Sequence, residues 1–322
     1  MRIYTLVFCF WAATGPLHAK IVFTSFRDGN WEIYKMDSDG GNQTRLTHNK
    51  VADTAPVWSP NGRQIVFERD EGKGEIYLMD ADGSNQRNLT NHPAMDTAPH
   101  WHPNGTRIIF FSGRGASSRI YVMDTAGGNV EEIPGLLRAS GPKWSPDGKW
   151  IAFEGVAEES DVIQIVNPDA NQLRVISVPI PRPMSVAGWS PDGRRIMYFA
   201  AFDDAGDDAI LVIVTLSRDG SGKAVGWQRV RPPRSIDGSP AWGADGKSIL
   251  FLGRNHGNEN IYRYRLDNRQ LIRLTDHPDS DGAPNEWHPL LTVSPQGLVP
   301  ILWGGIKSNY SNRSLPLLTL PR

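Results

Sequence analysis

The stretch that decides the fold reads Asp-Thr-Ala-Pro-Val-Trp-Ser-Pro-Asn-Gly and occupies residues 53–62. It returns 43 residues later, at residues 96–105, as Asp-Thr-Ala-Pro-His-Trp-His-Pro-Asn-Gly. Asn-Gly and Asp-Gly adopt positive φ angles readily and are strong signals of a hairpin turn. Each copy therefore predicts a strand that ends at a tryptophan and is followed by a tight turn.

The tryptophan recurs along most of the chain. Its copies are separated by 43, 43, 45, 53 and 45 residues and stand at Trp58, Trp101, Trp144, Trp189, Trp242 and Trp287. A short strand rich in β-branched and aromatic residues follows each of the first five turns, as at residues 64–67. A third strand, a glycine turn and a short last strand complete the repeat. Four antiparallel strands in about 43 residues are typical of a propeller blade, so we predict an all-β, six-bladed β-propeller.

The two ends of the repeat region predict how the ring closes. The first blade opens at residues 21–24 without a Trp-bearing strand before it, and the missing strand appears around Trp287. We therefore predict that the C-terminal strand joins the first blade and closes the ring. The alternative is a separate last blade formed by residues 283–303.

These repeats resemble those of the TolB family of β-propellers. The resemblance is clearest at residues 53–62, 76–83 and 45–47, and it covers nearly all of residues 20–290. It implies a six-bladed propeller in the periplasm or outside the cell, but it does not by itself imply a role in a Tol-Pal system. TolB carries an α/β domain ahead of its propeller, for which this chain has no residues between Ala19 and the first blade.

The first nineteen residues differ from the repeats. Arg2 precedes a short apolar run, Ile3 to Ala13, and Leu17-His18-Ala19 approximates a small-residue cleavage site. We expect a signal peptide at residues 1–19, a propeller at 20–303 and a tail at 304–322; an uncleaved anchor or a buried first strand are the alternatives to the signal peptide. The only cysteine, Cys9, lies in the apolar run, so the mature chain would have neither a disulfide nor a transmembrane segment. We expect a periplasmic or extracellular monomer.

The basic and acidic side chains nearly balance, so the protein as a whole has no strong net charge. The chain has 34 basic and 35 acidic side chains, which argues against nucleic acid as a partner. The periodic tryptophans are better explained by packing between blades than by sugar stacking.

Antiparallel pairing predicts two different faces of the ring. The turn face carries the tight turns after the first and third strands of each blade. The loop face carries the loops between the second and third strands and the connections between blades, and function is expected there. Four blades each carry an Asp and an Arg on this face, and we predict that they form structural ion pairs within each blade: Asp53 with Arg69, Asp96 with Arg114, Asp237 with Arg254, and Asp281 with Arg27.

The two remaining blades carry acidic loops without basic residues. Their acids include Glu154 and the candidate partner-binding residues Glu158, Glu159, Asp161, Asp203, Asp204, Asp207 and Asp208. They could dock a basic partner or form no more than a solvated acidic edge. Calcium is the one cofactor that such a stretch could hold, but the residues do not match the full calcium-loop pattern, so we predict no metal site.

No catalytic motif is found in the sequence. Neither the Gly-x-Ser-x-Gly elbow nor His-Glu-x-x-His occurs. We therefore predict an exported, non-enzymatic scaffold that binds a protein, peptide or glycan of the cell envelope. The alternative is a metal-assisted lyase or hydrolase with a site at the channel mouth.

Overall fold

The computed structural model describes residues 19–115, 118–136, 138–157, 160–177, 182–201, 210–255 and 258–289. Side chains are described within these ranges except at positions 182–184, 201, 237, 239 and 255. Nowhere in this part of the chain is there a helix long and apolar enough to cross a membrane.

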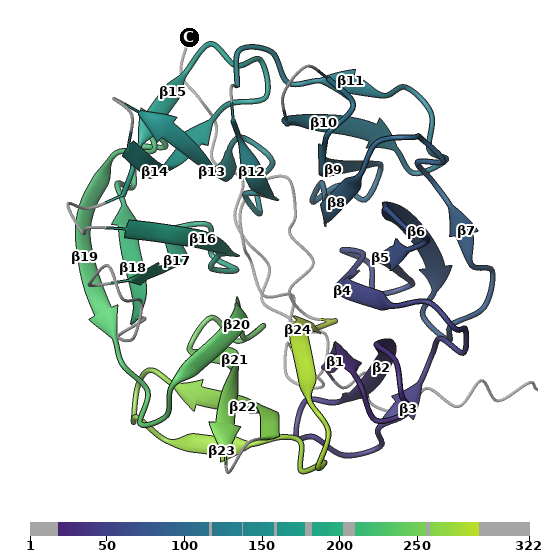
Figure 1. Cartoon of the computed structure of the whole chain (residues 1–322). Helices are drawn as coiled ribbons and strands as arrows, with labels where there is room; N and C mark the ends of the chain where they lie inside the picture. The colour runs from purple at the N-terminus through teal and green to yellow at the C-terminus, as the bar shows by residue number, and fades with distance from the viewer. Residues whose placement is uncertain are drawn as a thin grey trace, which may run out of the picture.

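Six four-stranded antiparallel sheets stand around a central axis, which confirms the predicted propeller (Figure 1). Blades 1 to 3 consist of β24 (Asp281–Trp287), β1 (Lys20–Ser25), β2 (Glu32–Asp37) and β3 (Thr44–Arg45); β4 (Asp53–Trp58), β5 (Gln64–Asp70), β6 (Gly74–Asp80) and β7 (Arg87–Asn88); and β8 (Asp96–Trp101), β9 (Arg107–Ser112), β10 (Arg119–Asp124) and β11 (Glu131–Glu132). Blades 4 to 6 consist of β12 (Ser140–Trp144), β13 (Ile151–Ala157), β14 (Ser160–Val166) and β15 (Leu173–Val175); β16 (Arg182–Trp189), β17 (Arg195–Ala201), β18 (Ile210–Leu216) and β19 (Ala224–Val230); and β20 (Ile236–Trp242), β21 (Ser248–Asn255), β22 (Asn258–Arg265) and β23 (Leu271–Arg273).

The ring closes through blade 1, whose strand order is β24-β1-β2-β3. Strand β24 pairs antiparallel with β1, with Lys20 opposite Trp287 and Ser25 opposite Asp281. The predicted closure is confirmed, and the alternative of a separate last blade at residues 283–303 is wrong. The domain boundary expected at 303 and the tail expected at 304–322 lie outside the described residues.

The innermost strands are bulged where Ala-Pro stands in the sequence. The register of β4 and β8 shifts just before the tryptophan, and Ala55 and Ala98 have φ angles of 48° and 52°. Alanine in this left-handed region costs about 1–2 kcal/mol, so the surrounding blades must enforce the conformation. Gly141, with φ of 59°, occupies the corresponding position in blade 4 without that cost. The bulge residues Ala55, Ala98 and Gly141 line the central channel.

The hydrophobic core lies between adjacent blades. One large ring in the second strand of every blade is fully or almost fully buried: Phe23, Phe67, Phe110, Phe153, Tyr198 and Phe251. The periodic tryptophans pack in the same interfaces, as predicted, and some also form hydrogen bonds across them. The indole N–H of Trp189 donates to the Lys143 carbonyl of the preceding blade at 3.0 Å, and that of Trp242 donates to the Gly188 carbonyl at 3.1 Å.

Candidate functional site

Three of the four predicted Asp–Arg pairs are brought together on the loop face. Arg69 Nε lies 2.7 Å from Asp53 Oδ1, and Arg114 Nη2 lies 2.5 Å from Asp96 Oδ2. In blade 1, Arg27 Nη2 lies 3.0 Å from Asp281 Oδ1. All three aspartates are completely buried, and each stands at the first residue of its innermost strand.

Each of these arginines also covers aromatic rings of its own blade. The Arg69 guanidinium lies 4.3 Å from the centre of the Tyr77 ring, and that of Arg27 lies 4.6 Å from the centre of Tyr34. Such a paired and stacked guanidinium is bound within its own blade, which supports a structural role for the pairs. In blade 6, Arg254 lies 3.2 Å from Glu259, and the side chain of Asp237 is not described.

The acidic residues of blades 4 and 5 fall mostly outside the described residues. Of the seven candidates only Asp161, an exposed residue of β14, is described; Glu158, Glu159, Asp203, Asp204, Asp207 and Asp208 are not.

Glu154, which the sequence assigned to the acidic loops, lies elsewhere. It belongs to β13, and its carboxylate accepts hydrogen bonds from Ser140 Oγ at 2.7 Å and from the Val186 N–H at 2.8 Å. Val186 belongs to β16 of the next blade, so Glu154 joins blades 4 and 5 beside the channel. The assignment of Glu154 to the exposed loops was therefore wrong, because β13 extends further than expected from the short strands of the repeat.

The ring axis is hollow and forms a channel of two adjoining cavities. The first, about 210 Å³, is walled by the Ala-Pro bulges of the innermost strands and also contacts Glu68 and Lys143. The second, about 250 Å³, lies at the level of the six periodic tryptophans. Val57, Ala187 and Asn285 line both cavities, so the two are neighbours along the axis. Mostly apolar walls with a few polar groups are typical of binding sites.

Ionisable side chains gather around the first cavity. Glu68 Oε1 accepts a hydrogen bond of 2.6 Å from the N–H of Ala98, the bulge residue of the next blade. Burial raises the pKa of Glu68. Burial also lowers the pKa of Lys143, although the carboxylates of Glu154 and Glu68 act in the opposite direction. Among the described residues, no acceptor forms a hydrogen bond or ion pair with the Lys143 ammonium group.

His100 lines the second cavity and lies close enough to Lys143 to feel its charge. Burial, with a further contribution from the charge of Lys143, lowers the pKa of His100 to about 3. Its Nδ1 accepts the backbone N–H of Trp144 at 3.3 Å, which the neutral imidazole can do. His100 is therefore neutral at pH 7.

The sequence did not single out this channel cluster, which consists of Glu68, His100, Lys143 and Glu154. A signal was nevertheless present, because Glu68 and Glu154 occupy the same position of the repeat, directly after the buried phenylalanine. His100 and Lys143 likewise precede their tryptophans, where Val57 and Ala241 stand in other repeats. Ionisable groups at positions where several other repeats have apolar residues indicated a place where the channel differs between blades.

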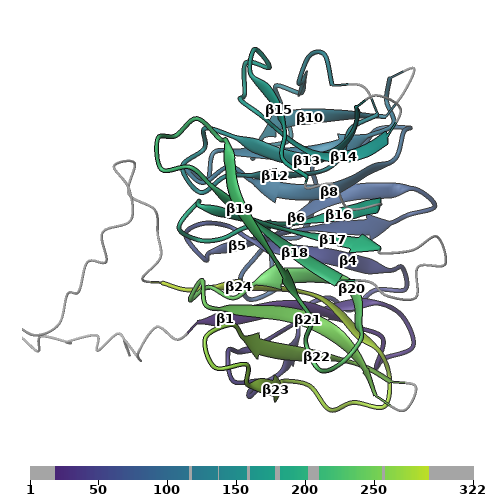
Figure 2. The same ribbon diagram turned by 90° about the vertical axis from the view of Figure 1, so that its left-hand side faces the viewer.

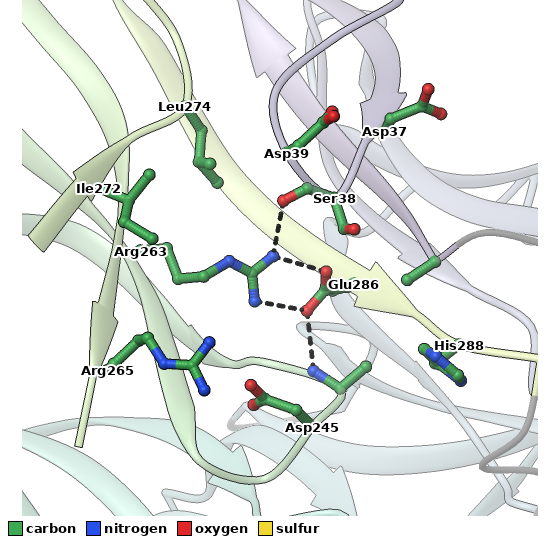
Figure 3. A pocket seen from close by; sticks show the side chains of 12 residues that line it. Asp37, Ser38, Asp39, Asp245, Arg263, Arg265, Ile272, Leu274, Glu286 and His288 are labelled. Atoms are coloured by element: carbon green, nitrogen blue, oxygen red, sulfur yellow. Dashed lines mark hydrogen bonds and ion pairs between the residues drawn. The ribbon is translucent and has the colours of Figure 1, made fainter. Parts of the chain in front are cut away.

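A further cavity of about 620 Å³ lies on the turn face between blades 6 and 1 (Figure 3). Arg263 forms two hydrogen bonds with Glu286 there, 2.6 Å from Nη2 to Oε1 and 3.1 Å from Nη1 to Oε2. Arg263 also donates to the Ser38 carbonyl, and the Ala244 N–H donates to Glu286. These bonds link β22 of blade 6 to both β24 and the β2–β3 turn of blade 1. The pair therefore stabilises the ring where it closes.

Comparison with known proteins identifies the family. The model of the TolB beta propeller domain matches residues 52–228. The chain belongs to this family. An uncharacterized protein of Agrobacterium fabrum is 34% identical to this TolB-type propeller over 157 residues, which are 45% of this chain and 54% of that protein. The Tol-Pal system protein TolB of Geobacter sulfurreducens is 51% identical over 51 residues, or 16% of this chain and 12% of that protein. The matches thus span about half or less of these relatives.

Solved structures show the same fold at low sequence identity. The crystal structure of TolB from Acinetobacter baumannii superposes with a TM-score of 0.72 at 18% identity, covering 84% of this TolB-type propeller and 67% of that chain. The structure of an oligogalacturonate lyase in complex with manganese superposes with a TM-score of 0.54 at 17% identity. This match covers 80% of the present chain and 74% of the lyase chain. In the described part of this chain, no three His, Cys, Asp or Glu side chains are grouped so that they could hold a metal ion.

Proposed function

We propose that this TolB-type propeller is an exported, non-enzymatic scaffold that binds a protein, peptide or glycan of the cell envelope at its channel. Several relatives are named as Tol-Pal system proteins TolB, which supports a role in the envelope. The observation that carries the proposal is the position of Lys143, whose side chain lines the apolar-walled first cavity of the channel. None of the described residues accepts a hydrogen bond from its ammonium group.

The neighbouring carboxylates define what the partner must bring. Glu154 already accepts two hydrogen bonds and Glu68 accepts one, whereas Lys143 still has donors to offer. A neutral group with oxygen acceptors, such as a peptide carbonyl or a sugar hydroxyl, would satisfy the ammonium without adding a further negative charge beside the two carboxylates. The small alanine and proline side chains of the bulges leave room for such a segment.

The acidic loops of blades 4 and 5 complete the proposed surface. On the sequence, Glu158, Glu159, Asp161, Asp203, Asp204, Asp207 and Asp208 would lie on the loop face and attract basic side chains of the same partner. This part of the proposal rests on the sequence together with the exposed position of Asp161.

Affinity capture with a matched pair of variants tests the proposal. Lys143→Met removes the channel ammonium, and Lys149→Met makes the same change at a side chain that is 74% exposed on a tight turn of the same blade. Envelope extract is passed over immobilised wild type and variants, and bound proteins and glycans are identified by mass spectrometry. We expect a partner that wild type and Lys149→Met retain and Lys143→Met loses. Identical capture by all three would refute a channel site, and a stoichiometric metal in the purified protein would favour the metal-assisted enzyme.

A further inference from the structure

The outermost strand of blade 5 differs from those of the other five blades. Strand β19 has seven residues, whereas β3, β7, β11, β15 and β23 have two or three. It runs along the rim of the disc, on the side that faces the viewer in Figure 2. Because β18 pairs with only one of its edges, β19 presents backbone N–H and C=O groups to solvent along the other.

The side chains of β19 are exposed as well. All of its residues except Val230 are exposed, including Val225 at 61% and Trp227 at 46%. The Arg229 guanidinium lies 5.5 Å from the centre of the Trp227 ring. Long exposed edges with large apolar side chains are usually avoided in soluble proteins because they recruit further strands. Such an edge therefore indicates an interaction site.

The surroundings of β19 are strongly basic. Residues 217–234 contain Arg218, Lys223, Arg229, Arg231 and Arg234 but only one acid, Asp219. A hollow of about 470 Å³ beside Val225 is lined by three arginines and one acid, Arg194, Arg195, Arg218 and Asp192. A second hollow of about 520 Å³ is lined by Arg229, Arg231 and Arg269 and contains no acidic residue in its described wall. A segment lying along β19 would therefore meet positive charge on both sides.

We propose that β19 is a docking edge for an extended acidic peptide segment of a partner protein, which adds as a fifth strand to blade 5. Strand addition supplies main-chain hydrogen bonds, while Trp227 and the arginines supply specificity. Two other occupants are disfavoured by charge. Pairing of two copies would bring two basic edges together, and residues 290–322 of this chain contain no acidic residue.

This edge is distinct from the channel site proposed above. Strand β19 is the outermost of blade 5, and the channel is bordered by the innermost strand, β16, with two strands between them (Figure 1). The inference therefore goes beyond the proposed function and can fail independently of it.

Peptide binding to the full chain tests this inference. The probes are a fluorescent decapeptide of alternating glutamate and threonine and its lysine–threonine counterpart, measured by fluorescence anisotropy at low and high salt. We expect the acidic peptide to bind at least tenfold more tightly than the basic one and to weaken as salt rises. Hydrogen–deuterium exchange should show protection gained at residues 224–230. Equal binding of the two peptides, or binding without that protection, would overturn the inference.

Variants place the binding on β19. Trp227→Glu and, as a second variant, Arg229→Glu should each weaken binding of the acidic peptide at least tenfold. The matched control is Leu173→Glu, which introduces the same charge at a 51% exposed side chain of β15. Lys143→Met should bind the peptide like wild type; loss of binding there would assign the peptide to the channel instead. Self-association that Trp227→Glu abolishes would show that a second copy, and not an acidic peptide, occupies the edge.

Discussion

Ionisable residues beside the propeller axis are held in two different ways. Asp53, Asp96 and Asp281 are completely buried, and each lies against an arginine of its own blade. Lys143 has nearby carboxylates but no described hydrogen-bond acceptor, and burial lowers its pKa. The first arrangement lowers the energy of a buried charge within one blade, while the second leaves donors that a partner can use.

Removing one member of a buried pair should be costly. Arg114→Met leaves Asp96 without its guanidinium, and we expect the free energy of unfolding to fall by about 3–5 kcal/mol. Urea unfolding measures this loss. Combining it with Asp96→Leu should recover part of the loss, because the uncompensated charge is then gone; strictly additive losses would contradict the pairing.

The protonation of His100 gives a pH-dependent prediction. Its folded-state pKa of about 3 lies below the ordinary value of 6.5, so between these values the unfolded chain binds a proton that the folded chain does not. His100 therefore contributes a loss of stability as pH falls from about 6.5 towards 3. His100→Gln, which keeps an acceptor for the Trp144 N–H, should flatten this part of the profile. Melting temperatures are measured for variant and wild type from pH 7.5 to pH 4. If the two melting temperatures fall in parallel, His100 has no such role.

The bulged innermost strand of each blade forms the wall of the channel. Its Ala-Pro bulge turns the Ala98 N–H towards Glu68, and the tryptophan that follows packs against the neighbouring blade. The repeat predicted these strands and their tryptophans because every blade needs them. It did not predict the channel cluster, because that cluster depends on how bulges of different blades meet.

Two of the tryptophans provide a matched comparison. The Trp189 indole N–H donates across the interface to the backbone carbonyl of Lys143. The buried indole N–H of Trp144, in contrast, has no partner among the described residues. Phenylalanine at position 189 should therefore destabilise the protein by about 1 kcal/mol more than phenylalanine at position 144, since one hydrogen bond is lost in addition to volume. Thermal or urea unfolding of the two variants checks the difference; the opposite order would contradict it.

The ring of the whole molecule is closed by the first and last strands of the propeller, β1 and β24. Strand β24 completes blade 1, and the Arg263–Glu286 pair fastens blade 6 to it. This closure was predictable because the first repeat lacks a strand that the last one supplies. The Arg263–Glu286 pair was not, because it joins side chains that only the closed ring brings together.

Breaking this pair should loosen the closure. In Arg263→Met, Glu286, 2% exposed, loses its guanidinium partner, and we expect a loss of about 3–5 kcal/mol in the free energy of unfolding. Limited proteolysis should then cut first near residues 19–25 and 281–288, in contrast to Arg114→Met. Cleavage spread evenly over the blades would contradict a specific role in closure.

Protection of a single cysteine from labelling tests most directly whether the partner binds in the channel. A chain beginning at Lys20 contains no cysteine, so Ser185→Cys places one thiol beside the first cavity and Ser84→Cys places one on an exposed tight turn. Reaction with a small maleimide is timed with and without the captured envelope partner. We expect the partner to slow labelling of the thiol at position 185 and to leave labelling at position 84 unchanged. Unchanged labelling at 185 with the partner bound would contradict a binding site in the channel.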